Sequence, residues 1–166
     1  DIPEYDAQII TGTKHMADLF EETTKICGKP KKVSNWLMGE TMRLLKEHGM
    51  EAEEICFAPE HLAALIELVD AGTINGSVAK EVFEEMFQSD IDPEKYVEEK
   101  GLKVVNDEGA LRETIEKVIA DNPQSVEDYH NGKKKAMGFL VGQTMKAMKG
   151  KANPAMVNTI LQELLV

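Results

Sequence analysis

Glycines and prolines divide this 166-residue chain into segments of helical length, and this punctuation constrains its fold more than any other feature. Within the segments, apolar residues recur at spacings of three and four, whereas the strict apolar/polar alternation of half-buried strands is scarce. Aromatic residues make up only 5% of the chain, and good helix formers fill the intervals. We therefore predict an all-α fold.

The stop and start signals place the helices. Helices are expected over residues 13–26, 31–48, 59–71, 93–99 and 125–129, and as a final pair over 131–149 and 153–165. A further helix is expected to begin at an N-cap at Ser77, and another to include Leu111 and to stop near Asn122. A short acidic joint covers residues 50–58. We place a domain boundary there, giving a helical unit over 1–58 and a second domain over 59–166, itself divided into 59–104 and 105–166.

Composition excludes several classes of protein. With 19 basic and 30 acidic residues, the formal net charge is −11, which argues against a uniformly basic nucleic-acid-binding domain. No apolar run approaches the roughly 20 residues of a membrane-spanning helix. Cys27 and Cys56 are far apart and lack histidines at ligand spacing, so we expect two buried thiols, no metal site and a reducing cytoplasm. The opening residues read like mid-protein sequence, and we expect a piece of a longer polypeptide.

Charge is distributed unevenly along the chain. The formal net charge is −4 over residues 1–57, −12 over 58–130 and +5 over 131–166. The six basic residues of the last segment are all lysine, and the chain has only two arginines, Arg43 and Arg112. Such asymmetry favours a polyanionic partner for the C-terminal segment. Lysine acts as a point charge on phosphate, so we expect recognition by shape, as for a structured RNA.

The C-terminal basic segment contains a periodic pattern. Five residues follow each other at spacings of 3, 4, 4 and 3, which places them on one face of a helix; we call them the lysine–glycine stripe, and they are Lys135, Gly138, Gly142, Lys146 and Lys149. An apolar face opposite them would dock on the rest of the domain. Lys133, Lys134 and Lys151 would widen the basic patch, and the helix N-terminus after Gly132 favours anions.

Glycine in a helix interior costs about 1 kcal/mol relative to alanine, so two glycines on an exposed face need a reason. One interpretation is a smooth floor against which a sugar-phosphate backbone lies while the lysines neutralise phosphates. The alternative is a protein-interaction module, in which the small residues let another helix or subunit pack closely. Phe139 could stack on an unpaired base, although packing against the last helix is the simpler expectation.

The sequence contains none of the usual motifs of a catalytic site. The four histidines are widely separated, and the chain lacks a phosphate-binding loop, a nucleophile elbow and a Cys-His signature. We therefore expect no catalytic residue and no metal ligand in this chain. Trp36, which follows Asn35, is most simply a core residue, although the pair could also anchor a neighbouring domain.

Two stretches carry a family resemblance. Residues 33–40, Val-Ser-Asn-Trp-Leu-Met-Gly-Glu, and the lysine-rich run from Lys135 to Pro154 resemble the C-terminal part of the GatB family, the GatB subunits of the aspartyl/glutamyl-tRNA(Asn/Gln) amidotransferases. The opening Ile-Pro-Glu-Tyr-Asp-Ala and the joint at residues 72–77 are also similar, so the likeness covers essentially the whole chain. It implies a helical linker followed by a YqeY-like tail domain.

The resemblance also implies a function. In the family, a catalytic cradle activates a tRNA-linked carboxylate with ATP and amidates it with ammonia from GatA, while GatC bridges the subunits. That cradle, with its ATP and Mg²⁺, is absent here. The implied role of this chain is tRNA recognition, positioning misacylated Glu-tRNA(Gln) or Asp-tRNA(Asn), in the cytoplasm and without a membrane. The acidic middle segment departs from an evenly basic RNA-binding surface, so we expect contact at the last helical pair.

Overall fold

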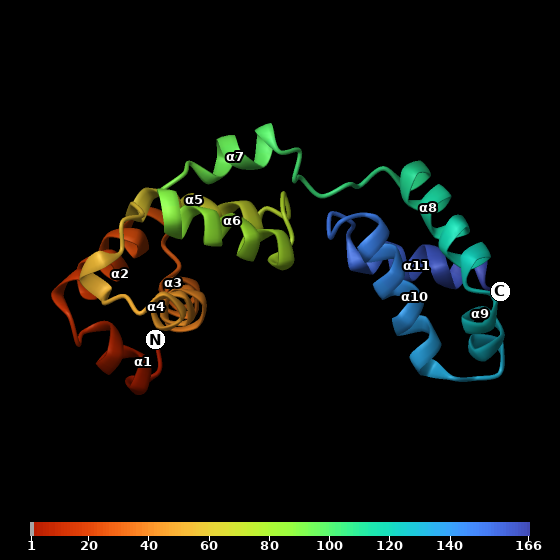
Figure 1. The fold of residues 1–166 in the computed structure, drawn as a ribbon, viewed down its shortest axis with the longest axis horizontal. Helices are drawn as coiled ribbons and strands as arrows, with labels where there is room; N and C mark the ends of the chain where they lie inside the picture. Colours follow the sequence, from red (N-terminus) through yellow and green to blue (C-terminus); the bar gives the residue numbers. More distant parts are fainter. Residues whose placement is uncertain (1) are drawn as a thin grey trace. The chain divides into compact units, whose positions relative to one another are not determined.

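The computed structural model describes residues 2–166 and confirms the all-α class. The chain forms two compact units, of which the first ends at Leu102 and the second spans Lys103–Val166 (Figure 1). In the part of the chain that the structure describes, extended pairing is limited to an isolated bridge between Val105 and Ala152. None of the described helices is long and apolar enough to cross a membrane.

The first unit is built from seven α-helices and two short turns of other helix types among its described residues. They are α1 Glu4–Ile10, α2 Lys14–Cys27, α3 Pro30–Trp36, a π-helical turn Leu37–Thr41, α4 Met42–His48, a 3₁₀ turn Ala52–Glu54, α5 Pro59–Asp70, α6 Gly76–Ser89 and α7 Pro93–Glu99. The helix expected over residues 31–48 is thus a continuous run interrupted by π-helical geometry. The spacing pattern did not predict α1.

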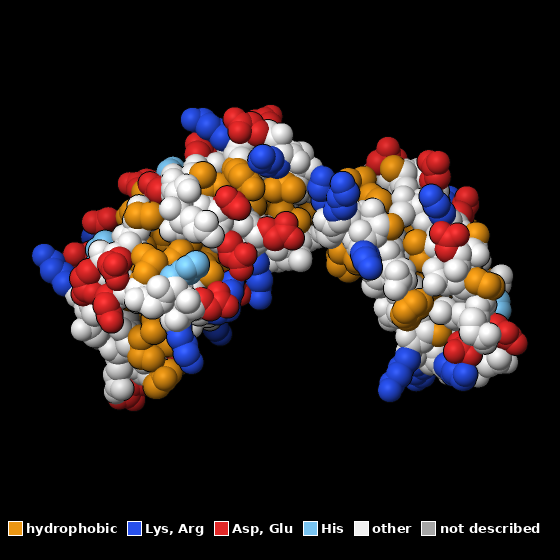
Figure 2. Space-filling view, viewed as in Figure 1, with side chains coloured by type: hydrophobic (Ala, Val, Ile, Leu, Met, Phe, Trp, Pro, Cys, Tyr) orange, Lys and Arg blue, Asp and Glu red, His pale blue; other side chains and the backbone are white. Residues whose placement is uncertain are grey.

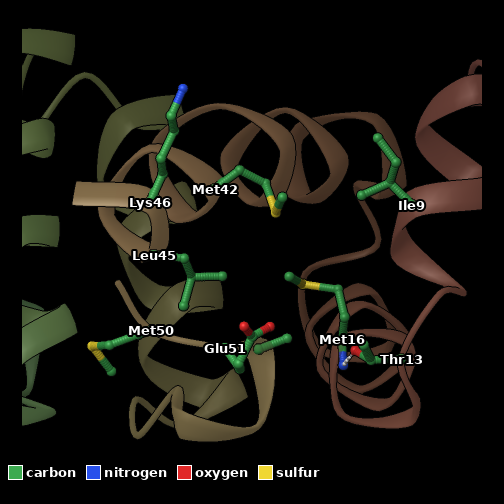
Figure 3. Close-up of a pocket in the computed structure, with 9 residues that line it drawn as sticks. Ile9, Thr13, Met16, Met42, Leu45, Lys46, Met50 and Glu51 are labelled. Carbon is green, nitrogen blue, oxygen red and sulfur yellow. Dashed lines mark hydrogen bonds between the residues drawn. The ribbon is translucent and has the colours of Figure 1, made fainter. Parts of the chain in front are cut away.

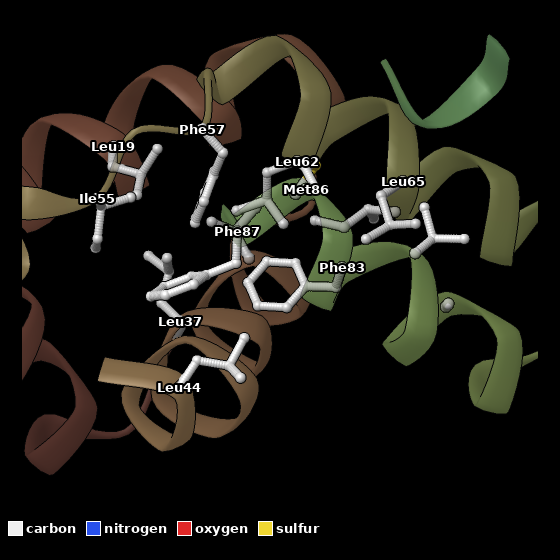
Figure 4. Packing of buried hydrophobic residues seen from close by; sticks show 14 of the residues in the cluster. Leu19, Leu37, Leu44, Ile55, Phe57, Leu62, Leu65, Phe83, Met86 and Phe87 are labelled. Carbon is white, nitrogen blue, oxygen red and sulfur yellow. The ribbon is translucent and has the colours of Figure 1, made fainter. Parts of the chain in front are cut away.

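The structure divides the chain differently from the boundary expected near residue 58. Helix α2 packs along α5, and buried residues from both sides of residue 58 share one hydrophobic core. Figure 4 shows Leu19 and Leu37 converging on Phe57, Leu62 and Phe83. Helix α5 also packs on α3, and α6 packs on the π-helical turn, so the apolar faces of the segments before residue 58 are buried partly against helices that follow it. The joint at residues 50–58 is part of this core.

Helix α6 begins two residues earlier than expected. Its N-cap is Asn75, whose side chain accepts a hydrogen bond from the backbone N–H of Val78 at 3.0 Å. Ser77, the expected N-cap, lies inside the first turn and is exposed. Both residue types cap helices well, but Gly76 already has helical geometry, and this leaves the capping position to Asn75.

The second unit contains four described helices around a separate core. They are α8 Glu108–Asp121, α9 Pro123–His130, α10 Lys134–Ala147 and α11 Pro154–Leu164. Leu111, Ile115, Leu140, Val157 and Leu161 are fully buried in this core. Helix α10 is shorter at both ends than expected, because Gly132 (φ 82°) precedes its N-cap, Lys133, and Lys149 (φ 51°) and Gly150 (φ 72°) follow its end. Left-handed backbone cannot continue an α-helix.

Candidate functional site

The two glycines of the lysine–glycine stripe lie exposed on α10. A β-carbon built at Gly138 or Gly142 would meet no atom within 4 Å outside the neighbouring backbone. On the opposite face, Leu140 and Thr144 are fully buried, and the Thr144 hydroxyl donates to the Leu140 carbonyl at 2.9 Å. No helix of this unit therefore covers the glycines, and the surface above them is open.

The lysines of the stripe are exposed. Within residues 2–166, none of Lys135, Lys146 and Lys149 takes part in an ion pair. Lys and Arg side chains gather near both ends of α10 on the face shown in Figure 2. One detail differs from expectation: Lys149 lies beyond the end of α10 in left-handed geometry, so helical periodicity does not determine its direction. The stripe is strictly helical from Lys135 to Lys146.

The flanking lysines differ from one another. Lys133 pairs with Asp128 at 2.7 Å, so its charge is partly neutralised. Lys134 is exposed in the first turn of α10, which has no side-chain cap. Lys151 is half-buried, and its carbonyl accepts a hydrogen bond from the backbone N–H of Val105 at 2.7 Å. Of these three predicted residues, Lys134 is the one best placed to add a free cation to the stripe.

Phe139 departs from the simpler expectation that it packs against the last helix. It is 46% exposed and does not pack into the core of the second unit. It follows Gly138 directly, so an exposed aromatic ring adjoins the open glycine surface. Aromatic rings next to cations are the side chains on which unpaired bases stack. Its exposure depends on which positions of α10 the neighbouring helices cover, and residue spacing along the chain does not show this.

Several ionisable groups elsewhere are engaged in structural pairs. Glu40 accepts from Lys80 and Arg43, both at 2.9 Å, and the hydrogen bond from Lys80, followed by that from Arg43, lowers the pKa of Glu40. His61 contacts Asp90 at 2.8 Å, and His130 contacts the Leu165 carbonyl at 2.8 Å. In residues 2–166, no group of three His, Cys, Asp or Glu side chains is arranged to hold a metal ion.

The cysteines depart from expectation. Cys56 is exposed, with its thiol 3.4 Å from the Phe87 carbonyl, and Cys27 is half-buried. Neither forms a disulfide in the structure. Cys56 lies between the buried residues Ile55 and Phe57, and successive side chains of an extended segment point in opposite directions, so Cys56 faces outward.

The first unit has an apolar cavity of about 430 Å³ beside α1, α2 and α4. Its walls include Met16, Met42, Leu45 and Met50, and Figure 3 shows Lys46 and Glu51 around the same space. Methionine-lined surfaces adapt to varied apolar groups. Nothing in the described residues indicates what occupies this cavity.

Comparison with known proteins decides the family. A family model described as the GatB domain matches residues 18–165. The chain belongs to this family. It is 72% identical over 165 residues to the GatB subunit of the aspartyl/glutamyl-tRNA(Asn/Gln) amidotransferase of Agathobacter rectalis, and the match covers 99% of this chain and 35% of that protein.

Further relatives carry the same name. The corresponding amidotransferase subunits of Lachnoclostridium phytofermentans and Lachnospira eligens are each 62% identical to this chain, and the matches cover 99% of it and 34% and 35% of those proteins. This GatB-domain chain therefore spans about a third of the length of the curated relatives that it matches. The resemblance identified in residues 33–40 and 135–154 is confirmed.

Proposed function

We propose that this GatB-domain chain is a non-catalytic tRNA-holding region of an amidotransferase GatB subunit. The lysine–glycine stripe lies against the sugar-phosphate backbone of misacylated Glu-tRNA(Gln) or Asp-tRNA(Asn). A separate site, outside this chain and using ATP and Mg²⁺, then amidates the amino acid on the tRNA 3′ end. GatA and GatC are the partner subunits of the whole protein, which acts in the cytoplasm without a membrane.

One observation carries the proposal: two exposed helix-interior glycines, with open space where their β-carbons would be, lie between lysines that have no ion pair in residues 2–166. A bare helix surface lets a bulky backbone approach closely, and the free ammonium groups can neutralise its phosphates. The relatives are named as subunits of a tRNA amidotransferase, and tRNA is a polyanion of this kind.

Filter retention of tRNA across a salt series tests the proposal. If three to five phosphates are contacted, log affinity falls with log salt at a slope of about −3 to −4.5. The Lys135/Lys146/Lys149→Glu variant should lose binding with an unchanged melting curve. A Lys14/Lys46/Lys95→Glu variant carries the same change in net charge on exposed positions of the first unit and should bind nearly as the unaltered chain does.

Two results would overturn the proposal. Equal loss of affinity in both triple variants would show that net charge, and not the stripe, determines retention. Absence of binding by the unaltered chain would favour the alternative, in which the glycine face docks another subunit. Lys149→Ala should weaken binding to the same extent for different tRNA species, because a phosphate contact carries no sequence information.

A further inference from the structure

A small cavity of about 220 Å³ lies in the first unit, where the π-helical turn meets the beginning of α6. Six residues line it: Asn35, Trp36, Gly39, Glu40, Gly76 and Lys80. We call it the Trp36 pocket. It combines an aromatic ring, a carboxamide, two glycines and an ion pair, and neither the core nor the lysine–glycine stripe accounts for that combination.

The backbone of this pocket is irregular. Residues 37–41 form a π-helical turn, and the hydroxyl of Thr41 at its end is buried without a hydrogen-bond partner among the described residues. Single π-helical turns within α-helices occur frequently at functional sites.

Gly39 and Gly76 keep the pocket open. A β-carbon at either position would meet nothing within 4 Å, and neither residue has a positive φ. Their backbone conformations are therefore available to any residue, and Gly39 costs about 1 kcal/mol relative to alanine in a helix. Backbone geometry does not require glycine here, so the space left by the missing side chains is the simplest physical reason for it.

The ring of Trp36 packs on a core residue, which fixes its position. Its ring lies 5.1 Å from the ring of Phe83, centroid to centroid, at 44°, and Phe83 is fully buried. The side chain itself is half-buried and lines the pocket. Beside it, the exposed Asn35 carboxamide makes no hydrogen bond within residues 2–166. A free carboxamide next to an aromatic surface can pair with the hydrogen-bonding edge of a planar ring.

The charges around the pocket suit a nucleotide. Glu40 is held by both Lys80 and Arg43, so the pocket wall carries no free carboxylate that would repel a phosphate. Lys31 lies one helical turn before Asn35, exposed and without an ion pair in the described part of the chain. An apolar side chain of a partner protein would use the ring but leave the Asn35 amide and the Lys31 ammonium unused.

We propose that the Trp36 pocket takes one unpaired nucleobase of a bound RNA, stacked on Trp36 with its hydrogen-bonding edge at Asn35. The inference rests on the proposed function, because the base belongs to the tRNA that the stripe holds. Lys31 then neutralises the phosphate beside that base. The pocket provides a contact in the first unit, which an interface confined to the last helical pair would lack.

The fluorescence of Trp36 provides a direct test, since this is the only tryptophan of the chain. The full chain is titrated with single-stranded hexauridylate, hexaadenylate and a tRNA transcript. Stacking should quench the fluorescence in a saturable manner. Gly39→Leu fills the pocket from an open position and should abolish quenching and weaken tRNA retention by about fivefold or more. Gly39→Ala is the matched control and should retain quenching.

Asn35→Ala should raise the nucleotide concentration needed for half-maximal quenching by about tenfold without changing the melting curve, because it removes the contact to the base edge but leaves the tryptophan ring. A tripeptide with a central phenylalanine serves as the protein-like probe. Quenching by this peptide and by none of the nucleic acids would overturn the assignment to a nucleobase.

The failures of the two proposals are distinguishable. The Lys135/Lys146/Lys149→Glu variant should lose tRNA retention and still show quenching by the hexanucleotides. If tRNA is retained but no nucleic acid quenches Trp36, the pocket inference is wrong and the stripe remains. If hexanucleotides quench Trp36 but tRNA is retained equally by the triple variant, the stripe is wrong and the base-binding pocket is supported.

Discussion

At the scale of single residues, two glycines, which have no side chain, leave an open surface on α10. Gly138 and Gly142 have helical geometry that any residue could adopt, and open space lies above both. Exposed Phe139 sits between them in sequence. The periodicity predicted the direction of the glycines correctly, because a helix fixes direction by spacing alone. It did not predict the exposure of Phe139, which depends on what the neighbouring helices cover.

Gly142→Glu should abolish tRNA retention and leave the fold intact. The new side chain has space, and replacing a helix-interior glycine raises helix propensity by several tenths of a kcal/mol. The new carboxylate would lie on the surface proposed to contact the sugar-phosphate backbone, and it would repel the phosphates. Retention and thermal melting, measured together, check this result. A large drop in the melting temperature would contradict the open surface, and Gly142→Ala is the control for the added bulk.

At the scale of elements, helix ends and interruptions are set by contacts as much as by residue type. Asn75 and Ser77 are both good capping residues, and only the geometry of Gly76 selects Asn75. The π-helical turn from Leu37 to Thr41 has no signal in residue spacing, because α- and π-helical turns use the same residue types. Val33, Leu37 and Leu44 recur at helical spacing in this run, and all three are buried.

Substitution at the α6 cap separates the two positions. Asn75→Ala should destabilise the first unit by about 1 kcal/mol, because the N–H of Val78 loses its acceptor. Ser77→Ala, inside the exposed first turn, should change stability by less than about 0.5 kcal/mol. Urea denaturation followed by Trp36 fluorescence measures both. The reverse order would place the cap at Ser77.

The free energy of unfolding of the first unit should fall with decreasing pH partly because Glu40 becomes protonated. Hydrogen bonds from Lys80 and then Arg43 lower the folded-state pKa of Glu40, so its contribution is fully present above the unfolded-state pKa of about 4.3. That contribution is lost as the pH falls through the folded-state pKa. Over an acid titration from about pH 6 to about pH 3, Glu40→Gln should therefore show a shallower loss of stability. Parallel curves for the two proteins would contradict this role.

At the scale of the whole molecule, residues 2–166 contain two separate hydrophobic cores, one on either side of residue 102. The expected internal boundary near residue 104 lies close to this division, whereas the boundary expected near 58 lies within the first core. Punctuation by glycine and proline marks where helices end. It carries no information on which helices pack against each other, and this packing determines where one compact unit ends and the next begins.

Substitutions in the two cores should affect different transitions. Leu140→Ala removes a fully buried side chain of the second unit and should destabilise that unit by about 2–5 kcal/mol. Trp36 fluorescence reports on the first unit, so the urea midpoint that it measures should stay unchanged. The helical circular dichroism should show part of its transition at a lower urea concentration than in the unaltered chain. Leu65→Ala, equally buried in the first unit, should shift the Trp36 midpoint instead. Coincident shifts would show one cooperative unit.

The sequence by itself determined the helical class, most helix positions, the direction of the stripe from Lys135 to Lys146, and the family. These properties depend on local spacing, on residue propensity and on motifs that lie within short segments. Tertiary structure alone decided that α2 packs on α5, that Phe139 and Cys56 are exposed, that Lys133 is paired with Asp128, and that Trp36 lines a pocket. Each of these depends on residues far apart in sequence or on backbone turns that the same residue types form in more than one way.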